Sequence, residues 1–169
     1  METTVRLYSP TYREIRTYII ATLFIAGNII LPQLCHTIPQ GGLIFLPIYF
    51  FTLVGACKYG WQVGLLTALL SPLVNHVLFG MPPAHTLLPI TVKSVVLALS
   101  AALIARRQGT VTLLSVAAAV VAYQTVGSLF ELALTGSYAA AVQDVRLGLP
   151  GIAIQIFGGY AVLRWLLWR

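Results

Sequence analysis

Residues 111–121 read VTLLSVAAAVV, a run that contains only apolar or small side chains. A second run of the same kind, VGLLTALL, occupies residues 63–70. A membrane β-strand alternates apolar and polar residues, whereas a membrane helix is apolar over a continuous stretch. The two runs therefore predict an all-α integral membrane protein rather than a barrel.

Proline, glycine and charged residues divide the rest of the chain into further apolar segments of similar length. Each segment approaches the roughly 20 residues that a helix needs to cross the hydrocarbon core of a bilayer. We expect one bundle of transmembrane helices and a single membrane domain over residues 1–169, with no soluble domain. The six predicted helices lie near residues 15–37, 42–57, 60–79, 86–105, 110–132 and 147–167.

The composition agrees with a membrane protein and argues against a nucleic-acid-binding one. Hydrophobic residues make up 59% of the chain and charged residues only 8%, against about a quarter charged in soluble domains. The mean hydropathy is +0.90. The net charge is +6, but the basic residues are scattered between apolar segments instead of forming a patch. The expected surroundings are therefore a lipid bilayer.

The basic residues predict the orientation, because lysine and arginine are retained on the cytoplasmic side. Of the residues in the predicted connectors on the other side, only Arg146 is basic. This asymmetry places both termini in the cytoplasm. The basic residues on the predicted cytoplasmic side are Arg6, Arg13, Arg16, Lys58, Arg106, Arg107, Arg164 and Arg169.

Polar side chains within the predicted helices lie near the middle or toward the outer end. Such groups are costly inside a bilayer, so they usually face the bundle interior or a water-filled cavity. The pattern predicts a polar cavity that opens outward and is closed inward, as in a receptor, whereas a channel needs polar lining through both halves. The candidate substrate-binding residues in the helices are Asn75, His76, Lys93, Gln124, Glu131 and Gln155.

Two outer connectors, residues 37–42 and 79–85, are rich in proline and glycine. They carry Gln40, Met81 and His85, which we interpret as residues of a gate over the cavity, although ordinary short turns have a similar composition. His36 is a further candidate for ligand contact. With Cys35 it would suit a soft metal, but an inert thiol and a loop histidine are the commoner outcome. We expect no metal site and no cofactor.

The polar residues also have purely structural interpretations. Lys93 and Glu131 are as well suited to neutralising each other across two helices as to contacting a ligand. A histidine such as His76 is more often a hydrogen-bonded interior residue than a ligand contact. Asn75 is more often bonded to a neighbouring helix than to a solute. Sequence alone leaves both interpretations open.

Two stretches carry a family resemblance: LPIYFFTLVGACKYGWQVGL at residues 46–65 and LSPLVNHVLFGMP at residues 70–82. They resemble the substrate-binding S components of energy-coupling factor (ECF) transporters. The resemblance implies a receptor in the bacterial cytoplasmic membrane that binds a vitamin, cofactor precursor or related micronutrient from outside. It also implies association with a transmembrane coupling subunit and two cytoplasmic ATPases.

The resemblance further implies a docking surface for the coupling subunit on the first helix. The family's Ala-x-x-x-Ala motif is not present there, and the nearest substitutes are Ala21, Thr22 and Ala26. Small residues at this spacing permit close approach of helices.

The chain contains no Gly-x-x-x-x-Gly-Lys-Ser/Thr run, so it has no P-loop to hold a nucleotide. No catalytic set is readable from residue spacing, and we expect a protein that is not an enzyme. The alternatives are an intramembrane enzyme using His76 or Cys35 with Glu131, a secondary transporter acting alone, and a structural or assembly subunit whose polar residues only join helices.

Overall fold

The computed structural model describes residues 10–167, and within that range the chain is helical with no strand. Arg6 and Arg169, which entered the predicted orientation, lie outside the described residues. The helices are α1 (Ile15–Cys35), α2 (Gly41–Phe45), the 3-10 helix η1 (Pro47–Tyr49), α3 (Phe50–Phe79), α4 (Ala84–Gln108), α5 (Leu113–Thr135), α6 (Tyr138–Ala141), α7 (Gln143–Leu147), α8 (Leu149–Ala153), the π-helix η2 (Ile154–Gly158) and α9 (Gly159–Leu167).

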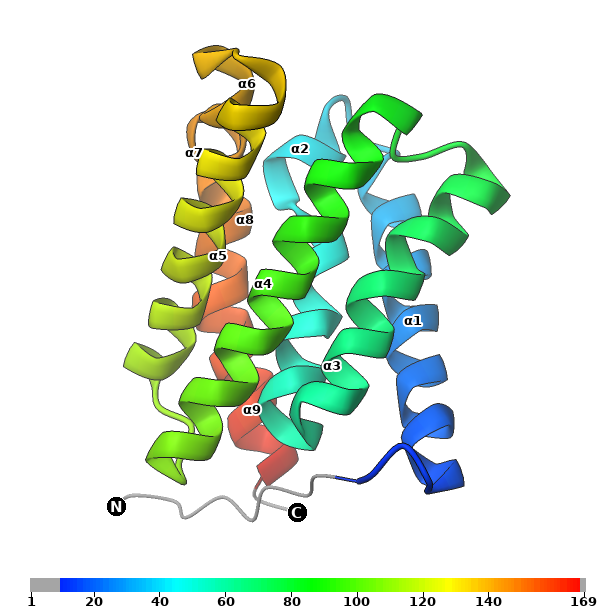
Figure 1. The fold of residues 1–169 in the computed structure, drawn as a ribbon, viewed down its shortest axis with the longest axis vertical. Coiled ribbons are helices and arrows are strands. Elements are labelled where there is room, and N and C mark those ends of the chain that lie inside the picture. Colours follow the sequence, from blue (N-terminus) through cyan, green and yellow to red (C-terminus); the bar gives the residue numbers. More distant parts are fainter. Residues whose placement is uncertain (1–9, 168–169) are drawn as a thin grey trace.

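The long helices form one bundle in which α3 packs against α1 and α4, and α4 packs against α5 (Figure 1). Five helical segments within residues 10–167 are long and apolar enough to cross a membrane, which indicates a multi-pass membrane protein. Large apolar side chains such as Leu114 and Val77 stay exposed, at 77% and 80% of their surface. Exposed apolar surface on this scale would be costly in water, and lipid removes that cost.

The segment predicted as a separate helix near residues 42–57 is divided in the structure. Pro47 restricts the residue before it to non-helical conformations, and Leu46 adopts left-handed backbone angles, with φ of 47°. The helix α2 therefore ends at Phe45, and helical structure resumes at Pro47 and continues into α3. The predicted boundary between residues 57 and 60 is marked by a break inside α3.

The helix α3 reverses direction at Gly60, which has φ of 81° and ψ of −177°. A Cβ atom placed on Gly64 would lie 2.7 Å from Cβ of Ala56. Residues eight positions apart in a continuous helix are separated by about 12 Å, so this contact requires a turn between them. Figure 1 shows the part of α3 before the turn running down and the part after it running up.

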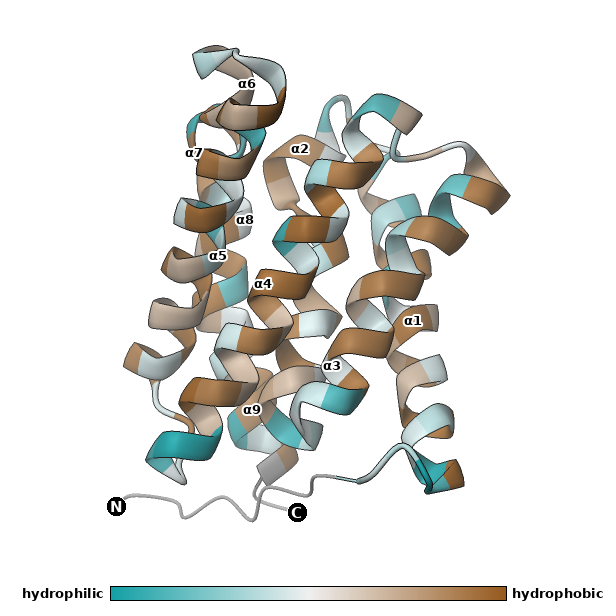
Figure 2. Ribbon diagram, in the orientation of Figure 1, coloured by the Kyte–Doolittle hydropathy of each residue, from teal (hydrophilic) through white to brown (hydrophobic). Residues whose placement is uncertain are grey.

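The start of α1, the end of α9 and the connector from α4 to α5 share the lower end of the bundle in Figure 1. Hydrophilic residues, including Arg106 and Arg107 in the last turn of α4, mark this end in Figure 2. Lys58 lies beside the Gly60 turn, and its Nζ donates a hydrogen bond to the carbonyl oxygen of Leu166, at 2.7 Å. A cation at the end of α9 is favourable because the last carbonyls of a helix have no partner within it.

A buried polar cluster joins α1 to both arms of α3. Pro32 has no N–H, so the carbonyl of Asn28, four residues earlier, lacks its helical partner. Asn75 Nδ2 donates a hydrogen bond to this carbonyl at 2.9 Å. The side chain of Asn28 in turn donates to Thr52 Oγ1 at 3.0 Å and to Ser71 Oγ at 3.2 Å. Asn75 therefore does bond a neighbouring helix, as the structural interpretation of the sequence proposed.

We predict that Gly60→Ala lowers the free energy of unfolding by about 1–3 kcal/mol, because only glycine adopts its backbone angles without strain. Thermal unfolding in detergent measures the loss. Gly158→Ala is the matched control, since its new Cβ would meet other atoms only at 3.6 Å. Equal stability of the two variants would show that the turn does not depend on glycine.

Candidate functional site

A cavity of about 490 Å³ lies at the end of the bundle opposite the one that carries Lys58, Arg106 and Arg107. Its size falls within the range of about 300–1,000 Å³ that is usual for small-molecule sites. The last turn of α1, the α1–α2 connector, the ends of α3 and α5, the start of α4 and α7 all contribute to its wall. Seven of the ten predicted binding residues line it: His36, Gln40, Asn75, Met81, His85, Lys93 and Glu131.

The other three predicted residues make structural contacts away from the cavity wall. His76 Nδ1 lies 2.7 Å from the carbonyl oxygen of Pro82, which holds the α3–α4 connector against α3. Tyr123 donates a hydrogen bond to Gln155 Oε1 at 2.8 Å and accepts one from Gln124 Nε2 at 3.0 Å. The bond from Tyr123 to Gln155 therefore joins α5 to η2, and Gln124 supports it from the same helix as Tyr123.

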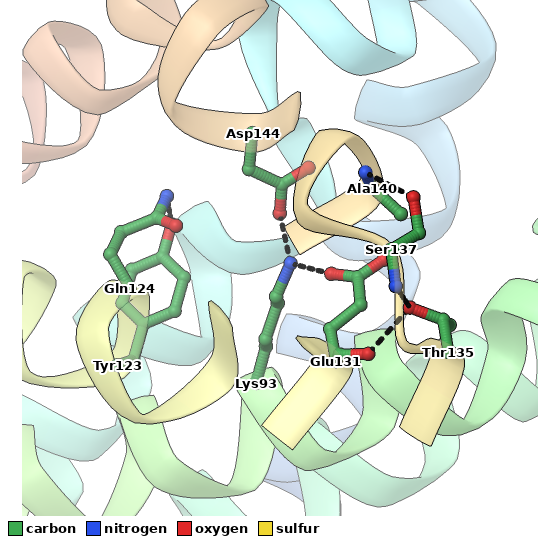
Figure 3. A network of polar contacts seen from close by, with 8 residues as sticks. All are labelled: Lys93, Tyr123, Gln124, Glu131, Thr135, Ser137, Ala140 and Asp144. Atoms are coloured by element: carbon green, nitrogen blue, oxygen red, sulfur yellow. Dashed lines mark hydrogen bonds and ion pairs between the residues drawn. The ribbon is translucent and has the colours of Figure 1, made fainter. Parts of the chain in front are cut away.

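The charged centre of the cavity wall is a buried ion-pair triad of Lys93, Glu131 and Asp144 (Figure 3). Lys93 Nζ lies 2.6 Å from Glu131 Oε2 and 2.7 Å from Asp144 Oδ2. The lysine side chain is 2% exposed, and the two carboxylates are 12% and 14% exposed. The sequence left open whether Lys93 pairs with Glu131, and the structure shows that it does.

The triad depends on a glycine that faces the lysine. A Cβ atom on Gly127 would lie 2.3 Å from Cγ of Lys93, closer than such atoms ever approach. The stem of Lys93 thus packs directly on the backbone of α5, and its ammonium reaches the level of Glu131 one turn later. Gly127 has a packing role that residue spacing did not reveal.

Asp144 was missed by the sequence analysis because it lies in a connector, on the short helix α7. A chain of hydrogen bonds shapes this connector (Figure 3). Thr135 Oγ1 donates to the carbonyl of Glu131 at 2.7 Å and accepts from the N–H of Ser137 at 3.2 Å. Ser137 Oγ then accepts from the N–H of Ala140 at 3.3 Å, at the start of α6. These bonds fold the chain back so that Asp144 faces Lys93.

Two polar groups on the cavity wall have no hydrogen-bond partner among the described residues. Asn75 Oδ1 and Gln33 Nε2 are both buried and unpaired. Buried polar groups are normally satisfied, so each exception calls for an explanation such as a ligand or an ordered water. Gln33 was not among the predicted residues. It meets the criterion that selected the others, since it is a polar residue near the predicted outer end of α1.

The predicted docking residues on α1 face different directions. Ala21 is buried inside the bundle with 2% of its surface exposed, whereas Thr22 and Ala26 are exposed. Thr22 Oγ1 is bonded to the carbonyl of Tyr18, at 2.8 Å. Only Thr22 and Ala26 therefore remain available for contact with a partner helix.

The cavity offers hydrogen bonds, apolar surface and charge. No group of three or more His, Cys, Asp or Glu side chains able to hold a metal ion occurs in residues 10–167. Cys35 and Cys57 are both free thiols, the first partly exposed at the end of α1 and the second buried in α3. The geometry is suited to holding a small solute.

Comparison with known proteins finds no match: no protein-family model, curated protein or solved structure corresponds to this chain.

We predict that Lys93→Met costs about 3–5 kcal/mol of unfolding free energy, because it leaves two buried carboxylates without their cation. The triple variant Lys93→Met, Glu131→Gln, Asp144→Asn should recover much of this loss, since it removes all three charges together. Chemical unfolding in detergent compares the two proteins. A triple variant less stable than the single one would show that the triad acts as independent contacts.

Proposed function

We propose that the chain is a membrane receptor for a small solute, the substrate-binding subunit of an ATP-driven importer of the ECF type. The observation that carries the proposal is the cavity, which combines unpaired buried polar groups with an apolar wall at one end of the bundle. The solute bound in the cavity would be a vitamin, cofactor precursor or related micronutrient, as the sequence resemblance implies.

The interior between the cavity and the opposite end supports a receptor over a channel. A cluster of buried apolar side chains, among them Leu53, Leu97, Val116 and Val120, fills much of this interior, and the buried polar side chains between them are single hydroxyls and amides such as Thr67 and Ser115. A channel requires a polar or wet path through both halves of the membrane. A solute bound in the cavity would therefore not reach the opposite end of the bundle until the helices rearrange.

We propose six membrane passes, with both arms of α3 crossing and both termini in the cytoplasm of a bacterial cell. The first arm, from Pro47 to Gly60, is about 20 Å long, which is shorter than the hydrocarbon core of about 30 Å. Pro47 and Ile48 at its upper end line the cavity. An interrupted helix beside a binding site is a recurring arrangement in transport proteins, because the irregular backbone borders a cavity and not lipid.

The source of energy must lie in partner proteins under this proposal. A ligand shifts a conformational equilibrium only by its differential affinity for the two states, so binding alone cannot drive accumulation. The sequence has no P-loop, and a coupling subunit with two ATPases would supply the work. Thr22 and Ala26 on the exposed face of α1 are the candidate contacts with that subunit.

The triad favours one alternative, a secondary transporter that couples uptake to an ion gradient. Buried ionisable residues in membrane helices often form proton or ion relays. Glu131 and Asp144 around Lys93 would then bind the coupling ion. This alternative requires no ATPase, which makes it separable by experiment.

We predict that the purified chain binds its solute without ATP and that liposomes containing the chain alone do not accumulate it. The test uses radiolabelled solute, identified by native mass spectrometry of the purified protein, with and without the ATPase and coupling subunits. Accumulation by the chain alone under a proton or sodium gradient would establish the secondary transporter.

For orientation, an impermeant thiol reagent applied to intact cells should label Cys35. The matched control is the double variant Cys35→Ala, Gln108→Cys, which moves the reactive thiol to the exposed end of α4 at the opposite side of the bundle. We expect this variant to be labelled only after the cells are opened. Labelling of the double variant in intact cells would reverse the proposed topology.

A further inference from the structure

We infer that the solute held in the cavity is an organic cation carrying at least one N–H donor, and not an anion. The inference rests on the proposed receptor function and specifies the chemical class of its ligand. Two observations carry it: the charge balance of the cavity wall and the oxygens left open by the ion-pair triad.

The fixed charges on the wall sum to −1. Lys93 contributes one positive charge, and Glu131 and Asp144 contribute two negative charges. Arg146 belongs to the same connector but is exposed and does not line this cavity. The carboxylates and the ammonium thus leave one uncompensated negative charge in a medium of low dielectric, which favours a cation.

The bonding of the triad points to the same class of ligand. The ammonium of Lys93 is bound to Glu131 Oε2 and Asp144 Oδ2. The second oxygen of each carboxylate has no hydrogen bond in the described part of the chain, so each can accept one from a ligand. An anion would have to displace one carboxylate from Lys93. It would then lie next to the displaced carboxylate, and the repulsion between the two negative charges is unfavourable.

The side-chain amide of Asn75 supplies a further acceptor whose orientation is determined. Its Nδ2 donates to two backbone carbonyls, those of Asn28 at 2.9 Å and Ser71 at 3.2 Å. Because only the nitrogen can donate, Oδ1 must be the unpaired atom. This atom has almost no accessible surface, and the unpaired Gln33 Nε2 on the same wall is a donor, so the two amides do not distinguish a cation from an anion. The remaining wall is apolar at Leu43, Ile48 and Ile90.

The experiment uses three indoles that share one ring and differ in charge: tryptamine as cation, tryptophol as neutral compound and indole-3-acetate as anion. A mixture of water-soluble vitamins covers other shapes, with thiamine as cation, pyridoxine as neutral compound and biotin and pantothenate as anions. Binding to the purified full chain is measured by calorimetry and native mass spectrometry at a pH of about 8, where ordinary histidines are neutral.

We expect cations to bind about tenfold or more tightly than anions of the same scaffold, because the field of one net charge acts in opposite directions on them.

Glu131→Gln makes the wall neutral and should remove that preference. Lys93→Gln lowers the net charge of the wall from −1 to −2, so a bound cation should stabilise this variant against heat more than it stabilises the unaltered protein. A merely structural role for Lys93 predicts a smaller effect. Lys58→Gln, outside the cavity, should retain the original preference.

The failures of the two proposals are distinguishable. Tighter binding of the anions, or recovery of an anionic solute with the purified protein, would overturn the cation assignment while leaving a receptor. Absence of binding by every compound, together with no solute recovered with the protein, would overturn both. Cation binding that survives in Glu131→Gln at full strength would also contradict the assignment, since the triad would not be its source.

Discussion

The buried ammonium of Lys93 is the constraint on which the upper half of the structure depends. A single charge at membrane depth costs several kcal/mol unless partners compensate it. The compensation comes from two different segments, Glu131 at the end of α5 and Asp144 on α7, at 2.6 Å and 2.7 Å. Satisfying one side chain therefore fixes the relative positions of α4, α5 and the following connector. Gly127 makes that geometry accessible, because any larger residue would occupy the space of the lysine stem.

The irregular backbone of the bundle is concentrated around the same cavity. Pro32, Pro47 and Pro89 all line it. Pro32 and Pro89 lie inside α1 and α4, where each lacks the N–H that a regular helix would use. In lipid an unpaired carbonyl is expensive, so such positions are tolerated only where protein or a water-filled space provides partners. Asn75 provides one for α1. The residues that weaken helical hydrogen bonding thus also create the opening in which a solute can be held.

The sequence was sufficient for the helical fold and for the gathering of seven candidate residues at one end of the bundle, since position along a helix follows from a rise of about 1.5 Å per residue. It was insufficient for direction around the helix axis. Gln124 and Gln155 do not line the cavity and belong to a hydrogen-bonded group with Tyr123. It also could not locate Asp144, because the folding of a connector depends on long-range contacts that residue periodicity does not encode. The Gly60 turn was predicted as a helix boundary, whereas the early break at Leu46 was not.

The charge balance connects the shape of the connector to the chemistry of the cavity. Lys93 neutralises only one of the two carboxylates that it holds, yet both are needed to surround its ammonium. The bond to Asp144 keeps α7 in the cavity wall. The bond to Glu131 keeps the side chain of Lys93 directed toward that wall. A wall assembled in this way retains one net negative charge as a consequence of its own stability. The preference for a cationic solute that we infer therefore requires no additional binding residue, because the interaction that closes the wall also supplies the field.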